Sequence, residues 1–129
     1  MDDSVLKFTQ LMEKVKSKDE EERRTAAHLL GELKDKRGVE ILIRLLSDPC
    51  SAVREAAAGA LEKIDGEEVI QKLISLLHSE EAYIRNIAIE ILEGIGEEAL
   101  QYLVFLLQDR DHDIRKFACD MLGNIGSPR

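Results

Sequence analysis

Short apolar runs recur along the chain with the spacing of a helix. Leu42-Ile43-Arg44-Leu45-Leu46 has counterparts in Leu73-Ile74-Ser75-Leu76-Leu77 and Leu103-Val104-Phe105-Leu106-Leu107. Apolar residues at i, i+3 and i+4 place a stripe of side chains on one face of a helix. Each run therefore predicts a helix with one buried side.

A second pattern alternates with the first. Val53-Arg54-Glu55-Ala56-Ala57 aligns with Ile84-Arg85-Asn86-Ile87-Ala88 and with Ile114-Arg115-Lys116-Phe117-Ala118. The arginines are 31 and 30 residues apart, and one further step of 31 back reaches Arg23. Agreement over four copies indicates a tandem repeat in which every unit contributes two helices.

These patterns predict an all-α fold of four antiparallel helix pairs. The units span approximately residues 4–34, 39–64, 68–94 and 98–125 of a single domain over 1–129, which is either complete or part of a longer array. The expected helices are 4–16, 20–34, 39–47, 51–64, 68–78, 82–94, 98–108 and 112–125.

The composition excludes several classes of protein. The chain of 129 residues has no Trp, and its net charge of -8 disfavours binding to a phosphate backbone. No run approaches the roughly 18 apolar residues of a membrane span. Met1-Asp2-Asp3-Ser4 lacks the features of a secretory signal. Cys50 and Cys119 have no metal or redox spacing, so we expect reduced thiols in a cytoplasmic protein, with a disulfide between them as the minor alternative.

The whole repeat resembles the HEAT-like family, in particular its short phycobilisome-lyase-type variety. The resemblance rests on Leu42–Asp48 followed by Val53–Leu61. It implies an α-solenoid with a right-handed superhelix, in which the second helices line a concave face. The family pattern also has an Asp six residues before the Arg. Asp48/Arg54 and Asp109/Arg115 match this spacing, whereas serines stand six residues before Arg23 and Arg85. The resemblance implies a ladder of Asp–Arg contacts between neighbouring units, and only half of this ladder is expected here.

The arginine column has two interpretations. The resemblance favours structural bonds to loop carbonyls or to the preceding Asp, and an anion-binding stripe is the alternative. The residues of this structural ladder are Arg23, Asp48, Arg54, Arg85, Asp109 and Arg115.

The concave face is the predicted binding surface for a protein partner. Small residues such as Ala27 and Gly31 are expected in its middle, and its later units are acidic, which favours an extended or helical basic partner. The predicted contact residues are Arg24, His28, Glu55, Ala58, Glu62, Asn86, Ile89, Glu90, Glu93, Lys116, Cys119 and Asp120. Phe117 and Met121 are expected on an uncapped end face that supports homodimerisation or partner docking.

The predicted function is a non-catalytic scaffold or adaptor. His28, His78 and His112 lack the His-Glu pairs with which HEAT-like hydroxylases bind iron, and no catalytic motif or metal spacing stands out, so neither a cofactor nor a membrane or nucleic-acid partner is expected. The resemblance implies one alternative, an accessory or subunit of a bilin-type lyase, which an aromatic-lined cleft would favour. DNA binding, as in HEAT-like glycosylases, would require a basic groove.

Overall fold

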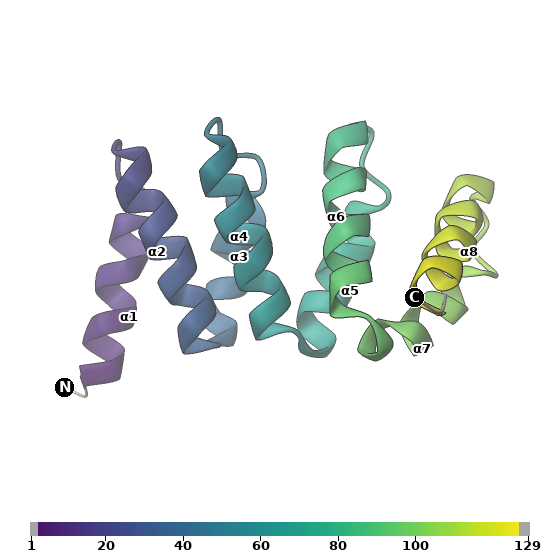
Figure 1. Cartoon of the computed structure of the whole chain (residues 1–129), viewed down its shortest axis with the longest axis horizontal. Coiled ribbons are helices and arrows are strands. Elements are labelled where there is room, and N and C mark those ends of the chain that lie inside the picture. Colours follow the sequence, from purple (N-terminus) through teal and green to yellow (C-terminus); the bar gives the residue numbers. More distant parts are fainter. Residues whose placement is uncertain (1–2, 127–129) are drawn as a thin grey trace. The chain divides into compact units, whose positions relative to one another are not determined.

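The computed structural model describes residues 3–126, so Met1 and Asp2 of the acidic start lie outside it. In that part the chain is helical and without strands. All eight predicted helices are present, with ends within about two residues of those expected, and the short 3-10 helix η1 is additional (Figure 1). The elements are α1 Asp3–Lys14, α2 Glu20–Leu33, η1 Lys36–Gly38, α3 Val39–Leu45, α4 Ser51–Ile64, α5 Gly66–Leu76, α6 Ala82–Ile95, α7 Glu97–Leu106 and α8 His112–Gly126.

The chain divides into two compact units at the boundary between the second and third repeats. The first unit, residues 1–64, holds the pairs α1/α2 and α3/α4, and the second, residues 65–129, holds α5/α6 and α7/α8. Four helix pairs in tandem confirm the all-α class of helical repeats. The single domain and the right-handed superhelix both depend on how the two units stack, and they stay predictions.

Local signals explain where the helices begin and end. The Asp19 carboxylate accepts the backbone N–H of Glu21, and three glutamates follow in the first turn of α2, where they suit the positive end of the helix. Between α6 and α7, Gly96 has a φ of 76°, a left-handed conformation that glycine adopts without strain. This glycine lets one repeat end and the next begin without a loop.

The core of each unit is a set of repeated small and aliphatic columns. Ala26, Ala57, Ala88 and Ala118 are fully buried, and Leu30, Leu61 and Leu92 fill the space beside them. The second helices α2 and α4 approach very closely, since a Cβ added to Gly31 would lie 2.7 Å from Ala60 Cα. Thin layers of this kind leave no room for large aromatic side chains.

None of the helices in residues 3–126 is long and apolar enough to cross a membrane. Both cysteines are free thiols, Cys50 half-buried and Cys119 exposed.

Candidate functional site

The arginine column holds the loops within the repeats. Each arginine donates through Nη1 to the backbone carbonyl six residues before it. The bonds are Arg23 to Ser17 at 2.9 Å and Arg54 to Asp48, Arg85 to Ser79 and Arg115 to Asp109, each at 2.7 Å. The same donor atom bonds the equivalent carbonyl in all four repeats. The recurrence of the arginines is therefore explained by a structural role in the loop and does not require anion binding.

Asp48 joins two neighbouring repeats in the first unit. Its carboxylate accepts Nε of Arg23 at 2.9 Å and Nη2 at 3.2 Å, and it also accepts the backbone N–H of Cys50 at 2.9 Å. Burial alone would raise the pKa of Asp48, but the hydrogen bonds from Arg23 and Cys50 outweigh it and hold that pKa below its usual value. The carboxylate thus bonds the arginine of the preceding repeat, whereas Arg54 donates to backbone carbonyls, those of Asp48 and Pro49.

Asp109, the corresponding aspartate of the second unit, has different partners. Its Oδ1 accepts the backbone N–H of Asp111 at 2.9 Å, and its Oδ2 lies 3.8 Å from Nε2 of His78. Within residues 3–126, Arg23–Asp48 is therefore the ion pair of the ladder, and Asp109 contributes to its own loop.

Most of the predicted partner-binding residues are exposed on the second helices. Three are half-buried, namely Ala58, Ile89 and Glu93. The exposed ones are Arg24, His28, Glu55, Glu62, Asn86, Glu90, Lys116, Cys119 and Asp120.

The structure places Ile89 and Glu93 at an edge of α6 rather than on an open face. Glu93 accepts a hydrogen bond from Asn124 of α8 at 2.7 Å. The same two columns in α2 hold Ala27 and Gly31, which are buried, with Gly31 directly against Ala60 of α4. The expectation that these small residues form an open groove is wrong, because they are the positions where neighbouring second helices approach.

Polar side chains bridge the second helices of the first unit. Glu32 of α2 pairs with Lys63 of α4, and His28 Nε2 lies 3.7 Å from the same carboxylate. The hydrogen bond from Lys63 lowers the pKa of Glu32, whereas burial raises the pKa of Glu62. Glu32 therefore has a charged partner on the neighbouring helix, whereas Glu62 is affected by burial alone.

The second unit carries almost all of the net charge. Residues 1–64 contain 13 acidic and 12 basic residues, whereas residues 65–129 contain 13 acidic and 6 basic residues. Glu90 and Asp120 are exposed on α6 and α8, and neither has an ion-pair partner among the described residues. The acidic character that was expected of the later repeats is thus a property of the whole second unit.

The prediction that Met121 lies on an exposed end face is wrong. This side chain is fully buried, and Phe117 is half-buried with the Arg85 guanidinium carbon 6.0 Å from its ring centroid. Met121 shares a column with Ala60 and Ile91, both of them also buried, so this column faces into the preceding layer rather than away from it.

Most of the exposed large apolar side chains of the second unit lie instead on α7 and just after it. Val104, Phe105 and Leu107 are exposed, Phe105 to 79%. Sequence reasoning missed this surface, although one signal was present. Phe105 stands in the column that holds Arg44 and Ser75, where a polar residue is the rule.

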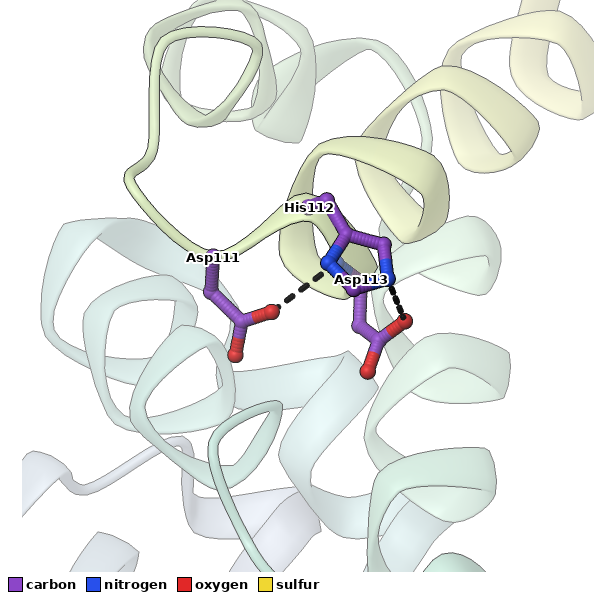
Figure 2. A group of neighbouring side chains, drawn as sticks. All are labelled: Asp111, His112 and Asp113. Carbon is purple, nitrogen blue, oxygen red and sulfur yellow. Dashed lines mark hydrogen bonds and ion pairs between the residues drawn. The ribbon is translucent and has the colours of Figure 1, made fainter.

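Three possible metal ligands lie together at the start of α8, another group that sequence reasoning did not single out. Figure 2 shows Asp111, His112 and Asp113, whose ligand atoms lie within 4.8 Å of one another. All three are exposed, His112 Nε2 lies 3.2 Å from Asp113, and Asp111 accepts the backbone N–H of Asp113. The arrangement is that of acidic residues capping a helix N-terminus, where they stabilise the helix without a metal.

The surface hollows are shallow and poor in aromatic side chains. A hollow of about 420 Å³ has no Phe, Tyr or Trp in its lining. Hollows of about 300 and 150 Å³ have one such residue each, Tyr102 in the first and Phe117 in the second. None of these three has the aromatic lining that a bilin chromophore would favour.

One comparison with known proteins identifies the type of repeat. A family model described as HEAT repeats matches residues 7–93 and 72–129. No curated protein matches the chain.

Three crystal structures of engineered proteins are similar to the chain. The first is 28% identical with a TM-score of 0.53, and the match covers 97% of this chain and 63% of that one. The second is 27% identical with a TM-score of 0.52, and the match covers 95% of this chain and 38% of that one. The third is 25% identical with a TM-score of 0.50, and the match covers 100% of this chain and 66% of that one. The chain thus spans less than two thirds of the length of each of the three.

Proposed function

Because this chain belongs to the family of HEAT repeats, we propose that it is a non-catalytic scaffold that binds a protein partner. The three histidines are all exposed, and each lies near a carboxylate, of Glu32, Asp109 or Asp113. The three hollows lack the aromatic lining expected for a bilin-type lyase, so they add no support to the resemblance to the phycobilisome-lyase variety.

The proposed binding site is the exposed surface of the second helices in the second unit. It consists of Asn86 and Glu90 on α6 and of Lys116, Cys119 and Asp120 on α8, and we name it the α6–α8 surface. The two helices pack against each other, and the Asn124–Glu93 hydrogen bond joins them beside this surface. Rigid helices present these side chains with little ordering cost when a partner binds.

The charge of the second unit is the observation that carries the proposal. Its 13 acidic residues face only 6 basic ones, so its field attracts a positively charged segment. The carboxylates of Glu90 and Asp120 have no ion-pair partner among the described residues, so that a partner's Lys or Arg has direct access to them. We therefore propose a partner with a basic helical or extended segment.

The test is an affinity capture with matched variants of the intact chain. Glu90→Lys/Asp120→Lys reverses the charge on the α6–α8 surface, and Glu68→Lys/Glu80→Lys makes the same change of net charge elsewhere in the second unit. All four positions are exposed, so both variants should keep the helical circular-dichroism spectrum of the wild type.

The expected result is a protein captured by the wild type and by the Glu68/Glu80 variant, but lost from the Glu90/Asp120 variant. Calorimetry with that purified protein should show weaker binding as NaCl is raised. Equal retention by both variants would place the site elsewhere. Equal loss from both would mean that net charge alone, and not this surface, attracts the protein.

A further inference from the structure

Asp65 is the single residue that connects α4 to α5, and its backbone conformation is unusual. Its φ is 42° and its ψ is -155°, and a positive φ is costly for a residue that carries a Cβ. The equivalent residue of the next repeat is Gly96, with a φ of 76° and a ψ of -130°. The chain thus holds an aspartate in a conformation that the next repeat gives to glycine.

This backbone conformation brings the side chain of Asp65 towards the next amide nitrogen. About the Cα–C bond, the Cβ of an L-residue lies about 120° from the residue's own nitrogen, so a ψ of -155° puts Cβ within about 35° of eclipsing the Gly66 nitrogen. A five-membered ring through Cγ and that nitrogen requires Cβ and the nitrogen on the same side of this bond. The backbone of Asp65 is therefore close to the geometry of ring closure.

Two other aspartates at N-cap positions lack this geometry. Asp19 and Asp35 have ψ values of 116° and 117°, which turn Cβ away from the following nitrogen. Their carboxylates accept backbone N–H groups, those of Glu21 at 3.0 Å and Arg37 at 2.9 Å. The Asp65 carboxylate makes no such cap bond, and it has no hydrogen bond or ion pair within residues 3–126. It is therefore free to approach the backbone.

Gly66 leaves its nitrogen open to this approach. Its N–H is the first of α5, and it makes no hydrogen bond to the part of the chain that the structure describes. Gly66 also has no side chain that could shield the nitrogen. Both residues of the pair are half-buried, and Gly66 borders the hollow of about 300 Å³, so water reaches the junction.

We propose that Asp65–Gly66 is a site of spontaneous isomerisation of aspartate to isoaspartate. The Gly66 nitrogen bonds to Cγ of Asp65, and the hydroxyl of the carboxyl group leaves with the amide proton as water, which closes a succinimide ring. A water molecule then opens the ring. Cleavage of the bond from nitrogen to Cγ restores aspartate, whereas cleavage of the bond from nitrogen to the backbone carbonyl carbon gives isoaspartate. One water is released and one is consumed, so no oxidant or reductant is needed.

Isomerisation changes the connection between two repeats. The backbone of isoaspartate runs through Cβ and Cγ, so the chain between α4 and α5 gains one carbon atom, and the former backbone carbonyl becomes a free carboxylate. Asp65 is the first residue of the second unit, so the added atom falls at the boundary between the units. The proposal is independent of the α6–α8 surface and of the partner proposed for it.

The uptake of heavy oxygen from enriched water measures ring formation, because each ring opening adds one solvent oxygen to the residue. After incubation of the intact chain at neutral pH, digestion with trypsin in ordinary water releases residues 64–72, in which Asp65 is the sole aspartate. Mass spectrometry then reads the label. Electron-transfer fragmentation of the same peptide distinguishes isoaspartate from aspartate.

Two variants provide the controls. Glu20→Gly places a glycine after Asp19, which has an extended ψ and a bonded carboxylate, so this pair matches the chemistry of Asp65–Gly66 without its geometry. Asp65→Gly removes the reacting carboxyl and suits the same backbone, as Gly96 does. Circular dichroism checks that both variants keep the helical fold.

The folded Glu20→Gly variant should take up label at Asp65 at least about 10-fold faster than at Asp19. Isoaspartate should accumulate at residue 65 in the same samples. Unfolding in urea should bring the two rates together, because both aspartates then sample similar conformations. The Asp65→Gly variant should take up no label in residues 64–72.

Equal rates at the two aspartates of the folded Glu20→Gly variant would overturn the proposal, since the backbone of Asp65 would then give no advantage. A difference that persists in urea would also contradict it, because the cause would be the local sequence and not the folded geometry. Label in residues 64–72 of Asp65→Gly would place the exchange on another carboxylate. Uptake at Asp65 without isoaspartate would mean that the ring reopens to aspartate alone, which refutes the isomerisation.

Discussion

Replacing Gly31 with alanine tests how closely the second helices approach. The new Cβ would lie 2.7 Å from Ala60 Cα and 2.8 Å from Ala60 Cβ, whereas non-bonded carbon atoms pack at about 3.5–4.0 Å. Because the nearer atom belongs to the backbone of α4, a rotamer change cannot relieve the contact. The two helices must move apart by about 1 Å, which loosens the packing of Ala27 and Ala57 beside them.

Two effects of opposite sign determine the change in stability. Alanine is favoured over glycine inside a helix by about 1 kcal/mol. Overpacking a tight core costs about 1–3 kcal/mol, and a clash with backbone belongs at the upper end of that range. We therefore expect Gly31→Ala to lower the free energy of unfolding by about 2 kcal/mol and the melting temperature by about 8 °C.

Gly59 of α4 provides the matched control. A Cβ added at Gly59 meets nothing within 4 Å, so Gly59→Ala gains helix propensity without a clash and should stabilise by about 0.5–1 kcal/mol. Urea denaturation followed by circular dichroism measures both variants. If Gly31→Ala proves as stable as the wild type while Gly59→Ala behaves as expected, the α2–α4 spacing is not set by this contact. The double variant Gly31→Ala/Ala60→Gly should recover only part of the loss, because the contact with the backbone of residue 60 remains.

Further predictions concern the loop arginines and the ladder. Asp48→Asn should destabilise by about 2 kcal/mol in urea denaturation, because Arg23 loses its charged partner and is only partly solvated; a loss no larger than that of Asp109→Asn would contradict this. Since the pKa of Asp48 is lowered in the folded state, its contribution is complete above about pH 5 and is lost as the pH falls through the folded value. The wild type should therefore lose more stability than Asp48→Asn between about pH 5 and pH 2, and parallel curves would refute the assignment. Arg54→Lys should cost about 1 kcal/mol, since the shorter lysine must bring its ammonium to the Asp48 and Pro49 carbonyls that Nη1 of Arg54 bonds, and Arg54→Ala should cost no less.

The helices and their pairing could be predicted from the sequence because the repeat encodes them several times over. Columns such as Leu30, Leu61 and Leu92 agree between copies, and these are the positions whose burial the fold requires. The loop contacts of Arg54 and Arg115 were expected from the family resemblance, because the recurrence of the arginines by itself also suits an anion-binding stripe. A column that recurs identifies a structural need, whatever the surrounding residues.

The repeat pattern does not predict which neighbouring helix packs against a given set of equivalent positions. Small residues at Ala27 and Gly31 suit an open groove as well as a close helix approach, and the distance from Gly31 to Ala60 decides between these alternatives. Met121 was misplaced for the same reason, since a large apolar residue in a column of small ones indicates a change of packing but not its direction. Asp48 shows a finer limit. The spacing pairs it with Arg54, whereas its carboxylate bonds Arg23 of the preceding repeat.

Function in a repeat protein is most readily located where a column departs from its own pattern on the surface. The exposed columns are free of packing requirements, so an exposed Phe105 among Arg44 and Ser75 is not explained by the fold. The division of charge follows the same logic. The acidic residues are shared evenly between the two units while the basic ones are not, so the negative charge on which the proposed partner depends belongs to the second unit and not to the repeat as such. Reversing the charges of Glu90 and Asp120 therefore tests whether the α6–α8 surface binds the proposed partner.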